Sequence, residues 1–565
     1  MEKSKFNVTI VTLIFSTVFL LAGCGNVGTN SKGSSASKYG VTYNGNGNTS
    51  GSVPSDATAY QKGETVTVLG NTGSLVKTGY SFNGWNTLTS GYGTTYTVGE
   101  NFTMGTANVT LYAQWTASAS GYTMTYNGNG GAGSVPVDSN RYYVGQTVTM
   151  PGNSGLTYTG YSFVGWQTKA DGSGTTYAAG KTFTMGSANV TLYALWAGGY
   201  AYAVNHNDGS EGTISQYTIG PNGALTPMFT PTVPTGGNDT RNIAVDPLGK
   251  YIYVSNPTSE TVSQFTIGAD GSLTSMSTPT ILVGPLAGGQ LYYPGTIAVH
   301  PSGPWAYVLN TQTFDINQYM IGANGSLTSM TTPTVVAGSG ESYPQSITVH
   351  PSGKWAYVPN DNGGYGGSIS QYNIDQMTGA LTSASPPTVA AGPAYSHPYD
   401  ITIEPTKGKY AYVADYGDGN ILQYNINQTT GALTPMSTPT VTIPMGGTMS
   451  ISITVDPSGR FVYATIGTNP STPTAVIAQF TIDQNTGALI AMTPPTVSAG
   501  GAGTAVITVE ASGKYAYATS GESGWGSSSI AQFTIDQTTG ALTLMNNPTV
   551  QTLGIGPSGI VTVGK

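Results

Sequence analysis

One strand-like pattern, Ile/Val-x-Gln-Tyr/Phe-x-Ile, occurs seven times between Ile214 and Ile535. Successive glutamines are separated by 48, 54, 53, 52, 56 and 53 residues. A near-constant period of this size, in sequence rich in strand-forming residues, predicts an array of small β-sheets closed by radial repetition. The repeated glutamines are Gln216, Gln264, Gln318, Gln371, Gln423, Gln479 and Gln532.

Each repeat contains four short strand-like segments separated by turns. In the fourth copy these segments are 347–349, 355–358 and 369–374, with a fourth that begins at Gly379. Four strands per repeat correspond to one propeller blade, so the sequence predicts seven blades over residues 198–565. Alternation along the strands places Tyr357 and Tyr372 on one face of this blade.

The two ends of the repeat array are incomplete in complementary ways. The first copy lacks an opening strand, and the segment 553–563 follows the last copy as an unpaired fragment. This fragment reads as a first strand, a turn and part of a second strand. We therefore expect it to complete the first blade and close the ring, which removes open sheet edges. Whether 201–204 or 560–563 fills the second-strand position is left open by the sequence.

Charged residues make up only 7% of the chain, and the formal net charge is −8. Gly, Tyr and small polar residues supply the surface instead, with 79 glycines and 37 tyrosines. No basic run lies beyond the first residues, which excludes nucleic acid as a partner.

The N-terminus has the pattern of an export signal. Lys3 and Lys5 precede an apolar run that ends at Leu21-Ala-Gly-Cys24, and Cys24 is the chain's single cysteine. This arrangement predicts a signal peptide over 1–23, and Leu-Ala-Gly-Cys resembles the bacterial lipobox. The resemblance implies cleavage before Cys24 and lipid on its thiol, hence a membrane anchor. An ordinary signal peptide that happens to contain a cysteine is the alternative.

The lipoprotein interpretation sets an expected location. Gly25 follows the cysteine, where an aspartate is linked to retention at the inner membrane, so we expect an exported protein of the outer membrane or cell surface. The Gly/Ser-rich segment 24–38 is typical of a flexible tether.

Two tandem copies of a shorter unit occupy residues 39–116 and 122–197. Thr-Tyr-Asn-Gly-Asn-Gly opens both, Gly-Tyr-Ser-Phe-x-Gly-Trp stands in the middle, and Leu-Tyr-Ala-x-Trp closes both. These marks resemble the Listeria–Bacteroides repeat of internalin-type surface proteins, which implies a small β-grasp-like spacer or adhesive module without catalytic activity. The four tryptophans are expected in the module cores, with exposed sugar-stacking platforms as the alternative. They are Trp85, Trp115, Trp166 and Trp196.

The propeller repeats resemble the lactonase-like propellers, the family of 6-phosphogluconolactonase and carboxymuconate-cyclizing enzymes, and the wider group of Tyr-Val-x-Asn surface repeats. The resemblance rests on a Tyr-Val-x-Asn/Asp segment after an x-Pro-x-Gly turn, and it extends over residues 200–565. It implies a fold more than an activity, because one fold supports many functions. The four segments are 253–256, 307–310, 357–360 and 412–415.

Lactone hydrolysis needs a base or positioned water and a group that stabilises the oxyanion. Lactonase-like enzymes commonly carry Arg and His before a blade's first strand. Here only the second blade has the arginine, Arg241, and no blade has a histidine directly after it. His397 and Asp400 form the other polar group at this level, and all three are expected to face one central channel. The same residues also suit ordinary loops, and His300 and His350 are expected to cap turns.

These observations predict an all-β protein with two β-grasp-like modules and a seven-bladed propeller. Its expected role is a non-catalytic, lipid-anchored surface protein whose propeller binds a protein or glycan. The alternatives are a secreted lactone hydrolase that uses His397, Arg241 and Asp400, and a purely structural component of the envelope. No cofactor and no metal are expected, because no ligand spacing for either stands out.

Overall fold

The computed structural model describes residues 37–117, 121–207, 210–284, 294–338, 343–363, 366–393, 395–416, 419–443, 450–466, 476–499, 504–520 and 528–564. The predicted signal peptide, Cys24 and nearly all of the predicted tether lie outside the described residues. All regular elements of the described chain are β-strands, which confirms the all-β class. The chain divides into two compact units, residues 1–118 and 119–565.

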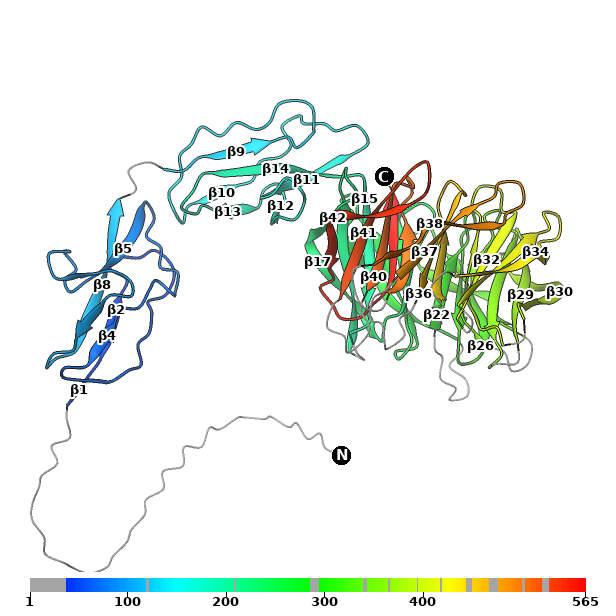
Figure 1. Cartoon of the computed structure of the whole chain (residues 1–565), viewed down its shortest axis with the longest axis horizontal. Coiled ribbons are helices and arrows are strands. Elements are labelled where there is room, and N and C mark those ends of the chain that lie inside the picture. The colour runs from blue at the N-terminus through cyan, green and yellow to red at the C-terminus, as the bar shows by residue number, and fades with distance from the viewer. Residues whose placement is uncertain are drawn as a thin grey trace, which may run out of the picture. The chain divides into compact units, whose positions relative to one another are not determined.

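Seven sheets of antiparallel strands form the propeller. They make up the green-to-red part of the chain in Figure 1. Their innermost strands contact one another in ring order. The first four blades contain β43 (Pro557–Gly564), β15 (Gly199–Asn205), β16 (Glu211–Ile219), β17 (Leu225–Asn238); β18 (Asn242–Val245), β19 (Tyr251–Asn256), β20 (Thr261–Ile267), β21 (Leu273–Leu282); β22 (Pro294–Val299), β23 (Trp305–Asn310), β24 (Asp315–Ile321), β25 (Leu327–Val336); and β26 (Tyr343–Pro344), β27 (Thr348–Val349), β28 (Trp355–Asp361), β29 (Gly367–Ile374), β30 (Leu381–Ala391).

The last three blades repeat the same order. They contain β31 (Pro398–Ile403), β32 (Tyr410–Asp415), β33 (Asn420–Ile426), β34 (Leu433–Thr442); β35 (Ser450–Val455), β36 (Phe461–Ile466), β37 (Val476–Ile482), β38 (Leu489–Ser498); and β39 (Thr504–Val509), β40 (Tyr515–Ser520), β41 (Ser529–Ile535), β42 (Leu542–Gln551).

The first blade is closed by the C-terminus, as expected. β43 is its innermost strand and pairs with β15 from Gly199–Gly564 to Asn205–Pro557, so β15 fills the second position. The expectation that residues 553–555 form the opening strand is wrong. Leu553 and Ile555 are more than half exposed and lie outside any strand. The opening strand is β43, which begins two residues after Ile555 and pairs with β15 along its whole length.

The seven repeated glutamines bind each blade to the next, and we call them the glutamine belt. Each lies on the third strand with at most 2% of its surface exposed. Its Nε2 donates to a backbone carbonyl of its own outer strand at 2.7–3.2 Å. Its Oε1 accepts the backbone N–H of a leucine in the next blade at 2.6–2.7 Å. Both ends of the buried amide are thus paired, which offsets the cost of its burial.

The glutamine belt closes on itself, because Gln532 of the last blade accepts the N–H of Leu225 in the first. This result confirms that the repeated position is scaffold. Seven equivalent side chains with equivalent partners do not define one asymmetric site.

A tyrosine stands opposite each glutamine on the second strand and makes a parallel bridge. The hydroxyls of these tyrosines donate to a glycine carbonyl of the following blade at 2.6–2.7 Å. Tyr357 is one of them and pairs with Gln371. Tyr372 pairs instead with Ala356 and donates to Val336 of the preceding blade. The placement of Tyr357 and Tyr372 on one face is therefore wrong, because a shift of one residue in register reverses the side-chain direction.

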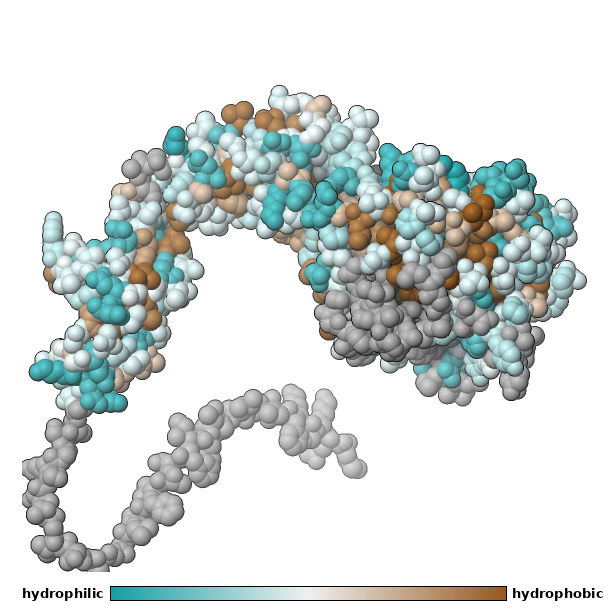
Figure 2. Space-filling view, viewed as in Figure 1, coloured by the Kyte–Doolittle hydropathy of each residue, from teal (hydrophilic) through white to brown (hydrophobic). Residues whose placement is uncertain are grey.

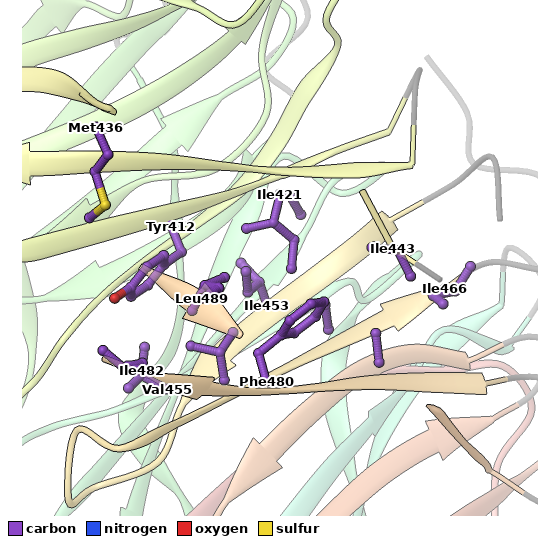
Figure 3. Close-up of a cluster of buried hydrophobic side chains, with 14 residues drawn as sticks. Tyr412, Ile421, Met436, Ile443, Ile453, Val455, Ile466, Phe480, Ile482 and Leu489 are labelled. Atoms are coloured by element: carbon purple, nitrogen blue, oxygen red, sulfur yellow. The ribbon is translucent and has the colours of Figure 1, made fainter. Parts of the chain in front are cut away.

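Apolar side chains fill the space between neighbouring blades. Figure 3 shows the cluster between the fifth and sixth blades, where Tyr412 and Ile421 meet Ile453 and Phe480. All four are at most 4% exposed. Alternate residues of each strand face the preceding and the following blade, so every blade contributes to two such clusters.

Each tandem module is built on a four-stranded mixed sheet. The parallel pair is β2 and β8 in the first module, and β9 and β14 in the second. The first module orders its sheet β2-β8-β5-β6 and the second β12-β11-β14-β9. The strands are β1 (Lys38–Tyr39), β2 (Val41–Asn44), β3 (Tyr60–Gln61), β4 (Thr65–Thr67), β5 (Tyr80–Asn86), β6 (Thr95–Tyr96), β7 (Asn101–Thr103), β8 (Val109–Ala117), β9 (Met124–Asn127), β10 (Thr147–Thr149), β11 (Ser162–Gln167), β12 (Thr176–Tyr177), β13 (Thr182–Thr184) and β14 (Val190–Ala197).

The module tryptophans form the module cores. Trp85, Trp166 and Trp196 are at most 2% exposed, and the partly buried Trp115 packs against the first core. Each indole N–H donates to a backbone carbonyl of its own module at 2.8–3.0 Å. The structure therefore favours a core role over sugar-stacking platforms.

The second module packs directly on the first blade. Val164 joins the apolar cluster of Tyr200 and Phe265, and Thr226 Oγ1 donates to Gly172 O at 3.2 Å. The residue equivalent to Val164 in the first module is Asn83, whose side chain is exposed. The polar-to-apolar change between two otherwise similar modules thus coincides with this intramolecular contact.

Candidate functional site

Asp400 lies on β31, the innermost strand of the fifth blade. Its carboxylate accepts the N–H of Ile453 in the sixth blade at 3.1 Å and the N–H of Ile401 at 2.9 Å. Asn242 makes the equivalent contact in the second blade, where its Oδ1 accepts the N–H of Ile297 at 3.0 Å. Asp400 therefore joins the inner strands of two blades as Asn242 does, but with a carboxyl group where Asn242 has an amide.

Burial raises the pKa of Asp400 to about 6. The N–H groups of Ile453 and Ile401 and the hydroxyls of Ser346 and Ser452 oppose this shift, because they stabilise the carboxylate. Ser452 lies on β35 of the sixth blade, and Ser346 lies between β26 and β27 of the fourth. Three neighbouring blades thus surround one carboxyl group whose pKa lies close to neutrality.

Tyr399 connects Asp400 electrostatically to Arg241. The Tyr399 ring is 38% exposed, yet neighbouring protein atoms and the Asp400 carboxylate raise the pKa of its hydroxyl. The positive charge of Arg241 acts in the opposite direction. Arg241 comes from the second blade, so residues of two non-adjacent blades share one electrostatic environment.

Arg241 is held by an acidic neighbour. Its Nε and Nη2 lie 3.2 and 3.4 Å from the two carboxylate oxygens of Asp239, and 54% of its side chain is exposed. This two-point pairing offsets much of the guanidinium charge.

His397 precedes β31 and lies between the fourth and fifth blades. Its Nδ1 is 2.9 Å from Asp361 Oδ1, and its backbone N–H donates to Asp415 Oδ1 at 2.8 Å. A carboxylate at Nδ1 places the ring proton there, so the neutral ring presents the Nε2 lone pair. His397 and Asp361 are both 28% exposed.

The three residues expected to share one site therefore have different principal partners. Asp400 joins inner strands, Arg241 pairs with Asp239, and His397 pairs with Asp361. The electrostatic effect of Arg241 and Asp400 on Tyr399 is the link between two of them.

Sequence reasoning missed Asp361 as a member of this site and gave no role to Tyr399, which stands between His397 and Asp400. Asp361 follows Asn360 at the end of β28, at a position occupied in other blades by Pro257, Thr311 and Tyr416. Comparing this variable position between repeats would have separated it from the scaffold.

The histidines of the repeated turns have the structural role expected of them. Nδ1 of His300 and His350 accepts a backbone N–H two residues further on, and Nε2 contacts a glycine carbonyl of the next blade at 2.8 Å. Burial lowers the pKa of both rings.

Within the described ranges, no group of three or more His, Cys, Asp or Glu side chains is placed to hold a metal ion. The same residues contain no helix long and apolar enough to cross a membrane.

The propeller residues match a known protein family. The family model for the seven-bladed β-propeller lactonases matches residues 172–287, 293–451 and 407–551, more than half of the chain. The chain belongs to this lactonase propeller family. A second model, the Listeria–Bacteroides repeat domain, matches residues 39–114 and 122–195, so both expected resemblances are confirmed.

Two curated relatives come from Evansella cellulosilytica. One is described as a Gly-rich membrane protein and is 39% identical over 179 residues, which are 31% of this chain and 20% of that protein. The other, described as a membrane protein, is 41% identical over 123 residues, or 22% of this chain and 16% of that protein. The chain thus spans a fifth or less of the length of the curated relatives that it matches.

Solved structures share the propeller fold. The periplasmic gluconolactonase of Pseudomonas aeruginosa has a TM-score of 0.52 and 17% identity, covering 65% of this chain and 99% of that one. A protein of Bacteroides fragilis described as a 6-phosphogluconolactonase has a TM-score of 0.50 and 17% identity, covering 65% and 98%. At this level of identity the likeness establishes the fold alone.

Proposed function

We propose that the protein is a lipid-anchored component of the bacterial cell envelope whose propeller binds an extracellular protein or glycan without chemical turnover. The observation that carries this proposal is the separate pairing of the candidate catalytic groups. Arg241 is engaged by Asp239 and His397 by Asp361, whereas hydrolysis requires a base and an oxyanion-stabilising group that converge on one reacting carbonyl.

The surface composition supports binding through neutral contacts. Only 7% of the residues are charged, and Figure 2 shows weakly polar colours over much of the visible described surface. Such a surface favours hydrogen bonds and aromatic packing over charge-driven recognition.

The envelope location is supported by the N-terminal sequence and by the relatives described as membrane proteins. Labelling of producing cells with radioactive palmitate tests the anchor. We expect label on the wild-type chain and none on Cys24→Ser. Equal labelling of both chains, or no label on either, would contradict lipidation at Cys24.

Binding and turnover are tested on one preparation, residues 24–565 with Cys24→Ser. We expect no hydrolysis of sugar or aliphatic lactones, and measurable binding to at least one glycan or extracellular matrix protein. Lactone turnover that is lost in His397→Ala or Arg241→Ala would overturn the non-catalytic assignment.

Lactone hydrolysis is the second candidate, and the His397–Asp361 pair favours it. In that reaction His397 Nε2 would take a proton from water as the water oxygen attacks the lactone carbonyl. The ring C–O bond would then break, and His397 would return the proton to the leaving ring oxygen to give a hydroxy acid. Asp361 would hold the imidazole in the required tautomer, and Arg241 would stabilise the oxyanion.

A further inference from the structure

We infer that one edge of the fifth blade binds neutral sugar rings, and this inference rests on the proposed binding function. The surface consists of Tyr395, His397, Tyr399 and Tyr416, with Asp361 from the fourth blade, and we call it the blade-five rim. It combines exposed aromatic rings with one polar pair, which is the composition that suits the apolar faces and hydroxyl edges of a pyranose.

The strand pairing brings the aromatic residues to one end of the blade. Pro398 at the start of β31 lies opposite Asp415 at the end of β32, so Tyr399 and Tyr416 flank one pair. Their ring centroids are 5.8 Å apart with an interplanar angle of 30°. Each is 38% exposed, although large apolar groups in this propeller are mostly buried. The two neighbouring, partly exposed rings are therefore available for contact with a ligand.

Tyr395 stands two residues before His397 in the segment that leads to β31. It is 68% exposed, and its φ of 76° is a left-handed conformation that bulky residues rarely adopt. Backbone strain of this kind is retained where the surrounding structure holds a side chain for a purpose. The ring gains no burial in return, which is consistent with a role toward a ligand.

The polar part of the rim comes from His397 and Asp361. Their 2.9 Å contact fixes the imidazole, and both side chains remain partly exposed. Together they present the Nε2 acceptor and carboxylate oxygens, which accept hydrogen bonds from sugar hydroxyls. Among the described residues, none forms a hydrogen bond with Nε2 of His397, so this atom can accept one from a ligand.

The charges near the rim favour a neutral ligand over a phosphorylated or acidic sugar. Arg241 is the cation that influences Tyr399, and it is already paired with Asp239. Asp361 and Asp400 add negative charge on the same side. An anionic sugar would meet these carboxylates with little compensating positive charge.

Calorimetric titration of residues 24–565 with Cys24→Ser tests the inference. The probes are hexamers of β-1,4-linked glucose, N-acetylglucosamine and mannose, with the galacturonic acid hexamer as a charged comparator. We expect at least one neutral hexamer to bind and the acidic hexamer not to bind. Tyr399→Ala and Tyr416→Ala should each weaken binding by about 2- to 10-fold, the range of a lost aromatic contact.

Two controls and a double variant separate the outcomes. Tyr399→Phe keeps the ring and should bind like the wild type even if Tyr399→Ala fails to fold. Tyr92→Ala, at a residue 92% exposed in the first module, should change nothing. Binding of no neutral hexamer would overturn the inference, and retained affinity in the Tyr399/Tyr416 double variant would overturn its location. Binding of a matrix protein alone would overturn the glycan assignment and leave the proposed function standing.

Discussion

The glutamine belt and the blade-five rim occupy the same propeller but differ in how their residues are used. Every glutamine of the belt is buried and hydrogen-bonded at both its amide nitrogen and its amide oxygen, and these contacts recur seven times with nearly constant distances. The rim has exposed tyrosines, a strained backbone at Tyr395 and a carboxyl group with a raised pKa beside it. Repetition therefore marks stability, and departure from repetition marks the candidate site.

The belt should give the largest loss of stability. Gln423→Ala leaves the N–H of Leu489 buried without a partner and removes the packing of a buried side chain, so we expect the free energy of unfolding to fall by about 2–4 kcal/mol. Chemical denaturation measures this change. Gln551→Ala, at an exposed glutamine of the outer strand β42, should stay within about 0.5 kcal/mol of the wild type. Equal effects of the two changes would remove the distinction between belt and surface.

Replacing Asp400 should raise the free energy of unfolding, whereas replacing a belt glutamine should lower it. The folded pKa of Asp400, about 6, lies above the usual 3.8, so the fold favours the protonated form, and stability falls as pH rises from about 4 to about 6. Above pH 7 the ionised group costs about 2–3 kcal/mol by the size of that shift. Asp400→Asn should thus raise the unfolding free energy at pH 8 and leave it unchanged at pH 4.

The control for this pH dependence is Asp375→Asn. The Asp375 carboxylate accepts the N–H groups of Met377 and Thr378, and its pKa is lowered. Asp375→Asn should therefore not raise the free energy of unfolding at either pH 4 or pH 8. A stabilised Asp375→Asn, or an Asp400→Asn variant with no gain at pH 8, would contradict the account of the inner carboxyl group.

The tyrosine bridges should give the smallest change. Tyr412→Phe removes one hydroxyl and leaves the carbonyl of Gly487 unpaired, which should cost about 1 kcal/mol. Thermal unfolding detects the difference against Tyr92→Phe, where the exposed ring should make no measurable contribution. Binding of the sugar hexamer should be unchanged in both, and loss of binding in Tyr412→Phe would break the separation of scaffold from rim.

The sequence predicted the scaffold well because its signals are local and repeated. The glutamine period predicts seven blades, and the incomplete ends predict closure by the C-terminus. The strand that closes the blade was misplaced, since residues 553–555 and 557–564 are both short and apolar and only pairing with β15 distinguishes them. Tyr357 and Tyr372 were placed on one face because register between strands is not encoded in either strand alone.

The candidate site was less predictable because its members meet only through tertiary structure. His397 and Asp361 are 36 residues apart and belong to different blades. Arg241 lies in the second blade and acts electrostatically on Tyr399 in the fifth, so the two residues are three blades apart in the sequence. The residue types alone indicated Arg241, His397 and Asp400, but their principal partners depend on loop geometry that has no period.

The most direct test of the account is a hydrogen-exchange footprint of residues 24–565 with Cys24→Ser, saturated with the neutral hexamer that binds best. We predict protection of amides in residues 395–401 and 414–416, with the equivalent segments of the other blades unchanged. Equal protection around the ring, protection confined to the two modules, or no neutral hexamer that binds would each contradict the claim that the blade-five rim is the binding site.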